Sequence, residues 1–242
     1  MAALNGLSRD ACKAATMRKI HLMQLVCGNE GKVTRSFEAM LRNDLSGLRV
    51  TYSLTLTSWI SVTVTGSEEQ VAADLLVRQY GELRDARPGD IVRAWLAGIN
   101  DDGIALDTGC KRVSVPCVRL EPFGRGTVEQ IASRFGLIHC LPLQIRLVGE
   151  FDAEFTKNQI DTLWRWKKGT DRINVNNATR AQIHAALKRS RHSRDVYAIE
   201  RLGILEHSIV CKKGTDAPGL VPQIGPYLES ELACVRGALN AR

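Results

Sequence analysis

Residues 18–81 alternate β-type runs with amphipathic helical runs, and this order admits few folds for the first third of the chain. Within 18–27, apolar residues occur at even positions (Ile20, Leu22, Val26) and at odd positions (Met23, Leu25), so both faces of the expected strand are largely buried. Residues 49–66 are rich in β-branched and aromatic side chains and break near Ser58 into two strands. Helical stripes occupy 31–45 and 67–81. The order strand, helix, strand, strand, helix predicts a small antiparallel sheet with its helices on one face.

Residues 90–122 contain several short β-type runs separated by turn signals. These signals are Asn100-Asp101-Asp102-Gly103, Thr108-Gly109 and Pro116. A short helix over 126–137 and a closing strand over 141–150 follow. This spacing is typical of a small Greek-key barrel of the oligonucleotide-binding (OB) type.

The same segment resembles an S1-like RNA-binding barrel. The resemblance rests on residues 88–92, the turn at Gly103, Leu106-Asp107 followed by Gly109, and residues 113–118. It implies an S1/OB-like β-barrel that contacts RNA. The central turn, residues 101–105, is acidic and then aliphatic, and it lacks the aromatic side chains on which bases stack. A barrel that serves as a spacer or a protein-docking module is therefore an open alternative.

Positive charge is concentrated in one fifth of the sequence. Residues 164–213 hold twelve Lys and Arg against four Asp and Glu, whereas the whole chain has a net charge of +7. The rest of the protein is therefore close to neutral. A concentrated basic patch is the electrostatic footprint expected for phosphate contact. Cations at a helix C-terminus also favour the helix dipole, which explains part of the cluster without a ligand.

The predicted site consists of basic residues near one helix and of the loop that follows the last basic strand. We expect nucleic-acid phosphates to contact Arg180, Lys188, Arg189, Arg191, His192, Arg194, Lys212 and Lys213. We expect the interface loop to consist of Gly214, Thr215, Asp216, Pro218 and Gly219. The run 212–216 lacks the order of a nucleotide-binding phosphate loop. A tight turn followed by a stretch held extended by Pro222 and Gly225-Pro226 is expected instead.

Residues 172–228 resemble an archaeal family of uncharacterised proteins, catalogued as a domain of unknown function. The signature-like parts are 194–196, 200–203, 205–207 and 214–219, and the two earlier regions fit the same layout. The resemblance implies an archaeal, cytosolic protein of information processing. It carries no assigned activity.

Catalytic and metal-binding patterns are absent from the sequence. The five histidines each stand alone in their segments, and the seven cysteines are scattered without C-x-x-C spacing. We expect reduced, buried thiols of a cytoplasmic protein, no metal and no cofactor. An acid–base pair of His207 and Asp216 is the one enzymatic alternative. The other explanation for Glu206 and His207 is an ion-paired strand end. No run of about 18 apolar residues exists, so no membrane span is expected.

Together these patterns predict an α+β protein. Its predicted parts are a flexible tail (1–17), an N-terminal α+β domain (18–83), an S1/OB-like barrel (84–150) and a basic C-terminal α+β domain (151–242). We expect a non-catalytic RNA-binding factor, associated with the ribosome, translation or another ribonucleoprotein, whose C-terminal domain contacts phosphates. The alternative is a protein-interaction factor of the transcription or translation apparatus without direct nucleic-acid contact, and an RNA-processing enzyme ranks below both. No small-molecule substrate is indicated.

Overall fold

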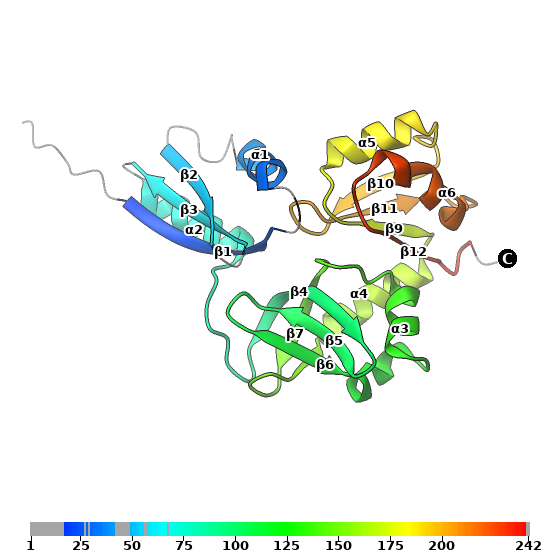
Figure 1. Cartoon of the computed structure of the whole chain (residues 1–242), viewed down its shortest axis with the longest axis horizontal. Coiled ribbons are helices and arrows are strands. Elements are labelled where there is room, and N and C mark those ends of the chain that lie inside the picture. The colour runs from blue at the N-terminus through cyan, green and yellow to red at the C-terminus, as the bar shows by residue number, and fades with distance from the viewer. Residues whose placement is uncertain are drawn as a thin grey trace, which may run out of the picture.

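A computed structural model describes residues 17–26, 28, 30–41, 49–55, 58–66 and 68–240. Apart from Met17, the predicted tail lies outside the described residues. Three antiparallel sheets follow one another along the chain, each with its own layer of helices (Figure 1). The predicted α+β class is therefore correct. We call the three parts the N-terminal, central and C-terminal units.

The N-terminal unit is a three-stranded sheet covered on one face by two helices. The strands are β1 (Met17–Leu25), β2 (Arg49–Leu54) and β3 (Trp59–Thr65), in the order β1-β3-β2. The helices are α1 (Glu30–Leu41) and α2 (Glu69–Tyr80). Alternate strand residues such as Leu22 and Val62 share one buried core with Phe37 of α1 and Leu76 of α2. The two helices therefore cover the same face, because period-2 strands present one parity to them.

The opposite face of this sheet packs on the central unit. Met23 and Trp59 join Trp95 and Cys140 in a separate buried cluster. The rings of Trp59 and Trp95 meet edge to face, with centroids 5.1 Å apart. An aromatic pair of this geometry stabilises a contact beyond the contribution of the area that it buries. The pair therefore helps to hold the N-terminal sheet on the central unit.

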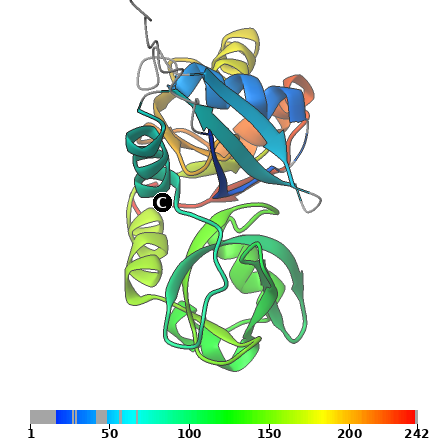
Figure 2. The ribbon, with the colours of Figure 1, turned by 90° about the vertical axis from the view of Figure 1, so that its left-hand side faces the viewer.

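The central unit is a strongly curved five-stranded sheet (Figure 2). Its strands are β4 (Ile91–Asn100), β5 (Gly103–Asp107), β6 (Arg112–Pro116), β7 (Pro142–Leu147) and β8 (Ala153–Phe155), in the order β6-β5-β4-β7-β8. Among the described residues, a single isolated β-bridge, between Ser114 and Asp152, pairs the two edges of this sheet. The described residues thus form no closed barrel, and the S1/OB assignment stays a prediction.

Helices fill the open side of this curved sheet. A 3-10 helix, η1 (Cys117–Phe123), leads into α3 (Val128–Phe135), and α4 (Lys157–Lys168) follows β8. Leu163 and Trp166 of α4 are buried in the central core. The predicted boundary at residue 151 puts α4 in the C-terminal domain, whereas its apolar stripe faces the central sheet.

The C-terminal unit is a four-stranded sheet with two helices on one face. The strands are β9 (Arg172–Val175), β10 (Val196–Arg201), β11 (His207–Cys211) and β12 (Leu232–Val235), in the order β10-β11-β9-β12. Helix α5 (Arg180–Arg189) contributes Ile183 and Leu187 to a core shared with Ile173, Ile209 and the second helix.

That second helix corrects the sequence prediction of an extended segment. Residues Ala217–Ile224 form α6, and a short 3-10 helix, η2 (Gly225–Tyr227), continues it. Pro218 lies in the first turn, where a missing N–H costs nothing because first-turn amides have no partner within the helix. Leu220 and Ile224 are buried against the sheet. Their packing outweighs the unfavourable helix propensity of Gly219 and Pro222.

The C-terminal unit contacts both other units. The turn between β10 and β11 reaches across to the N-terminal unit, where Ile204 and Leu205 are buried in that unit's core. On the other side, the Asn174 side-chain amide donates to the carbonyl of Gly136 at the end of α3, with an N···O distance of 2.8 Å. Figure 1 shows α1 and α5 lying opposite each other across the resulting junction.

Candidate anion-binding surfaces

Most of the predicted phosphate-contacting residues gather at one end of the C-terminal unit. Helix α5 ends there, and the turn that follows it returns to the start of β10 beside the end of β11. The Lys212 amide donates to the Asp195 carbonyl (2.8 Å), and Val196 pairs with Cys211. We call this cluster the basic end; its members are Lys188, Arg189, Arg191, Arg194, Lys212 and Lys213.

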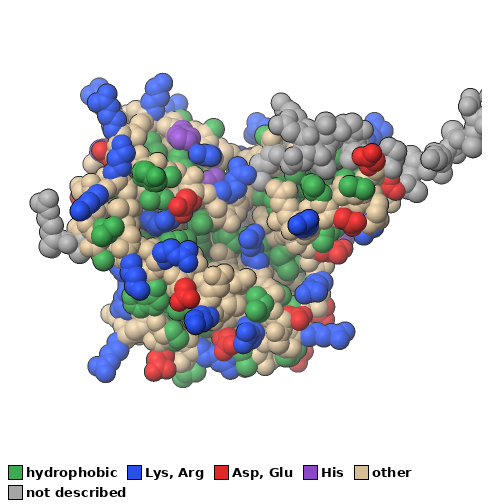
Figure 3. Space-filling model, turned by 180° about the vertical axis from the view of Figure 1, so that it is seen from behind, with side chains coloured by type: hydrophobic (Ala, Val, Ile, Leu, Met, Phe, Trp, Pro, Cys, Tyr) green, Lys and Arg blue, Asp and Glu red, His purple; other side chains and the backbone are tan. Residues whose placement is uncertain are grey.

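All six cations of the basic end are exposed. Within the described part of the chain, none of them forms an ion pair or a side-chain hydrogen bond. Seen from behind, Lys and Arg side chains project from the upper left of the molecule, where the C-terminal unit lies (Figure 3). These charges are therefore available to an anionic partner.

His192, also predicted to contact phosphate, is held inside the protein's own network. Its Nδ1 lies 2.6 Å from an Asp195 carboxylate oxygen, and its Nε2 contacts the Gln223 side chain of α6. The hydrogen bond with Asp195, and then the one with Gln223, raises the pKa of this imidazole. His192 thus connects the end of α5 to α6.

Arg180 lies apart from the basic end, at the opposite end of α5. A helix of ten residues is about 15 Å long. The predicted single patch is thus two surfaces, and Arg180 belongs to the second.

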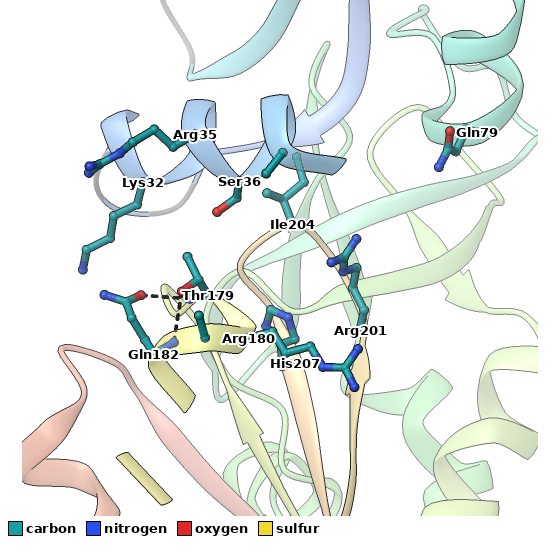
Figure 4. A pocket seen from close by; sticks show the side chains of 12 residues that line it. Lys32, Arg35, Ser36, Gln79, Thr179, Arg180, Gln182, Arg201, Ile204 and His207 are labelled. Atoms are coloured by element: carbon teal, nitrogen blue, oxygen red, sulfur yellow. Dashed lines mark hydrogen bonds between the residues drawn. The ribbon is translucent and has the colours of Figure 1, made fainter. Parts of the chain in front are cut away.

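This second surface is a cavity of about 740 Å³ between the N-terminal and C-terminal units, which we call the junction pocket. Figure 4 shows the lining side chains around it, from α1 above and from α5, β10 and β11 below. The Arg35 side chain turns back along α1, where its Nε donates to the Gly31 carbonyl at 2.9 Å. The charged lining residues are all cationic: Lys32 and Arg35 from α1, Arg180 from α5, and Arg201 from β10. Among the described residues, no Asp or Glu lines this cavity.

The N-terminus of α5 opens into the junction pocket. Thr179 caps the helix by accepting from the Gln182 amide, and the Gln182 side chain accepts from the Thr179 amide. This capping box leaves the amides of Arg180 and Ala181 without an acceptor among the described residues. Both residues line the pocket. Helix N-termini with open amides are ready-made anion sites.

His207 forms part of the pocket wall and is 1% exposed. Neither of its ring nitrogens makes a hydrogen bond of acceptable geometry with another described residue. Burial, and in smaller measure the Arg201 and Arg180 guanidinium groups, lower the pKa of His207 to about 4, while the carbonyls of Leu205 and Ala178 oppose this shift. The ring is therefore neutral near pH 7, with one donor and one acceptor unused.

Glu206 lies beside His207 in the turn that enters the N-terminal unit. It is buried, and desolvation raises the pKa of its carboxyl to about 8, although backbone N–H groups of residues 204–206 act in the opposite direction. The carboxyl is therefore largely protonated at neutral pH. No ion pair involves Glu206 or His207 among the described residues, so an ion-paired strand end is not what this sequence forms.

The predicted interface loop lies on a different side of the C-terminal unit from the junction pocket. The Thr215 hydroxyl donates to the Asp195 carbonyl, and the Asn240 side chain bridges Gly214 and Thr215. Asp216 stands at the N-cap of α6, beyond the end of β11, whereas His207 begins that five-residue strand. At about 3.3 Å per residue, the two side chains are too far apart for the acid–base pair considered from the sequence.

Sequence reasoning missed three of the four pocket cations. Lys32 and Arg35 belong to the helical stripe 31–45 and Arg201 to the basic segment 164–213, and the sequence singled out none of the three as a site residue. No local pattern links the helix at residue 32 to the strand at residue 201. Only the insertion of Ile204 and Leu205 into the N-terminal core brings the two segments to one cavity.

The cysteines agree with the prediction of reduced, buried thiols only in part. Cys211 is free and buried. Cys140 is disulfide-bonded, and Cys110 and Cys117 are free but exposed. Among the described residues, no cluster of three or more His, Cys, Asp or Glu side chains has metal-binding geometry. None of the described helices is both long and apolar enough to cross a membrane.

Comparison with protein-family models finds a match for each of three consecutive segments of the chain. Residues 19–86 match the DUF2110 N-terminal domain, residues 86–167 the DUF2110 central domain, and residues 170–236 the DUF2110 C-terminal domain. No curated protein matches the chain in sequence. The three matches follow one another in order and cover nearly all of the described residues. The chain therefore belongs to the DUF2110 family, a family of unknown function, as the resemblance in residues 172–228 predicted.

Proposed function

We propose that this protein binds RNA and contacts its phosphates through the basic end of the C-terminal unit. The observation that carries the proposal is the set of six exposed cations, none of them in an ion pair within the described part of the chain, at the meeting of α5, β10 and β11. An ion pair with a neighbouring carboxylate would neutralise such a charge, and the described residues form no such pair with these six cations. A surface of this kind attracts a polyanion and releases its counterions on binding.

The dipole of α5 accounts for only part of this cluster. Lys188 and Arg189 lie in the last turn of the helix, where cations favour the dipole. Arg194, Lys212 and Lys213 lie outside the helix, so this effect does not require them. Their presence on the same end therefore favours recognition of phosphates. Within this proposal, the curved central sheet is an S1-like module, and the protein is an archaeal, cytoplasmic factor of translation or of another ribonucleoprotein.

The test measures binding of the full chain to a fluorescent single-stranded RNA over a range of salt concentrations. Single strands give a slope of log K against log salt of about −0.7 per phosphate contact. The triple variant removes three cations of the basic end: Arg189→Gln, Arg194→Gln and Lys213→Gln. We expect it to lower the magnitude of the slope by about 2, because three contacts at about 0.7 each are lost.

The matched control removes two arginines and one lysine that are exposed elsewhere. Its substitutions are Arg78→Gln, Arg125→Gln and Lys157→Gln. Both triple variants change the net charge equally, so only a local contact distinguishes them. Equal loss of affinity in the two variants, or no RNA binding by the unaltered chain, would overturn the proposal.

Exposed apolar side chains on the central unit support a second candidate, a protein-interaction factor. Val118 is 77% exposed and Phe151 is 60% exposed, and both belong to segments next to β6, where the Ser114 amide donates to the Phe151 carbonyl. Purification of the protein from cell extract, with and without nuclease, separates the candidates. A defined protein partner that survives nuclease treatment favours this second function, whereas a partner lost with the RNA favours the first.

A further inference from the structure

We propose that the junction pocket is a binding site for a phosphate monoester, held between the N-terminus of α5, the Arg180 and Arg201 guanidinium groups, and the cations of α1. This site goes beyond RNA contact at the basic end, from which it is separated by the length of α5. The choice of nucleotides as the monoester rests on the proposed function, whereas the phosphate chemistry rests on the pocket alone.

The charge of the lining favours a dianion. Of the described residues, four cationic side chains and no carboxylate line the cavity. Glu229 pairs with the Lys32 ammonium group at 3.2 Å, so the excess positive charge comes from Arg35, Arg180 and Arg201. Burial raises the pKa of the Glu206 carboxyl. A phosphate monoester brings close to two negative charges at neutral pH, and a diester brings one. The monoester is therefore the better electrostatic match.

Hydrogen-bond donors at the α5 N-terminus match the oxygens of a phosphate. The amides of Arg180 and Ala181 are open, and guanidinium groups bind phosphate through two parallel N–H donors. His207 lies in the pocket wall and is 1% exposed, and neither ring nitrogen makes a hydrogen bond of acceptable geometry with the described residues, although the carbonyls of Leu205 and Ala178 act on the ring. Buried polar atoms are satisfied in the great majority of cases. Because the His207 nitrogens have almost no accessible surface, a ligand oxygen accepts from this ring only after the pocket wall shifts.

The volume of the cavity indicates that the ligand is more than a free phosphate ion. About 740 Å³ lies within the range of roughly 300–1,000 Å³ found for small-molecule sites. Ile204, Ala39 and Ala181 provide apolar lining beside the cations. This arrangement suits a phosphate group at the helix N-terminus with an organic group, such as a nucleoside, in the rest of the cavity.

The experiment uses the full chain and isothermal titration with AMP, inorganic phosphate and adenosine. We expect AMP to bind, phosphate to bind more weakly, and adenosine to bind at least about tenfold more weakly than AMP, since a charged hydrogen bond is worth about that factor or more. Arg180→Gln and Arg201→Gln should each weaken the binding of AMP by a similar factor. Both side chains are exposed, so these variants should fold, and Arg78→Gln is the control that should bind AMP normally.

The source of the monoester is identified with three RNA oligonucleotides of one sequence, carrying a 5′-phosphate, a 3′-phosphate or hydroxyl groups at both ends. Tighter binding of one phosphorylated oligonucleotide, lost in Arg201→Gln, identifies an RNA end as the ligand. Binding of AMP without any end preference identifies a free nucleotide. The inference is overturned if AMP binds no better than adenosine, or if Arg180→Gln and Arg201→Gln bind AMP as the unaltered chain does.

These outcomes keep the two proposals apart. RNA binding that ignores the end group, together with no binding of AMP, refutes the pocket and leaves the basic end in place. AMP binding in a chain that binds no RNA refutes RNA binding and leaves the pocket.

Discussion

Truncation of Leu205 tests whether the turn between β10 and β11 is a structural part of the N-terminal unit. Leu205 is 1% exposed and lies in a core otherwise made by β1, β3, α1 and α2. Leu205→Ala removes three carbon atoms, worth about 2.5 kcal/mol at about 0.8 kcal/mol each. A residual cavity adds to this loss, so we expect about 3–4 kcal/mol, within the usual range of about 2–5 kcal/mol for such changes.

Leu75→Ala is the matched control, because it removes the same atoms from a side chain of α2 that is 41% exposed. We expect this substitution to lower the free energy of unfolding by less than about 1 kcal/mol. The assay is urea unfolding followed by tryptophan fluorescence, since Trp59 is buried where the N-terminal and central units meet. If the free energy of unfolding falls by about 3 kcal/mol per molar urea, Leu205→Ala should lower the urea midpoint by about 1 M. A shift no larger than that of Leu75→Ala would show that the turn does not occupy the core.

Three further changes probe other contacts. Burial raises the folded-state pKa of Glu206 from 4.5 to about 8, so the stability that this group contributes should fall as pH rises between these values. Glu206→Gln should make the urea midpoint less dependent on pH over that window. Gly136 has φ 61°, and an added Cβ would meet Val235 at 2.6 Å; Gly136→Ala should cost about 2 kcal/mol or more in urea unfolding, whereas Gly98→Ala, with open space, should not. Asp195→Asn should return the raised pKa of His192 toward its ordinary value in an NMR titration, and an unchanged pKa would exclude the hydrogen bond as its cause.

Elements whose pattern is local were predictable from the sequence. The capping box at Thr179 and Gln182 marks the start of α5, and the structure shows both of its hydrogen bonds. The break at Ser58 separates β2 from β3, where Ser58 adopts a positive φ of 63°. In each case neighbouring residues determine the backbone, so a short window of sequence contains the necessary information.

Elements that depend on tertiary packing were not predictable in this way. Helix α6 contains Gly219 and Pro222, whose local preferences oppose a helix, and it forms because Leu220 and Ile224 cover the sheet. Strand β12 has four residues and pairs with β9, which lies far away in sequence. The junction pocket is the extreme case, since its cations come from α1, α5 and β10.

The construction of the junction pocket links ligand binding to the contact between units. Lys32 and Arg35 lie on the N-terminal side of the cavity, and Arg180 and Arg201 lie on the C-terminal side. Without an anion, Arg35 on one side and Arg180 and Arg201 on the other repel one another across the junction. The Lys32–Glu229 ion pair and the burial of Ile204 and Leu205 offset that repulsion. A bound dianion converts the repulsion into attraction on both sides. Ligand at 100 times its dissociation constant should therefore add about 2.7 kcal/mol to unfolding that separates the units, and unfolding confined to the central unit should not respond.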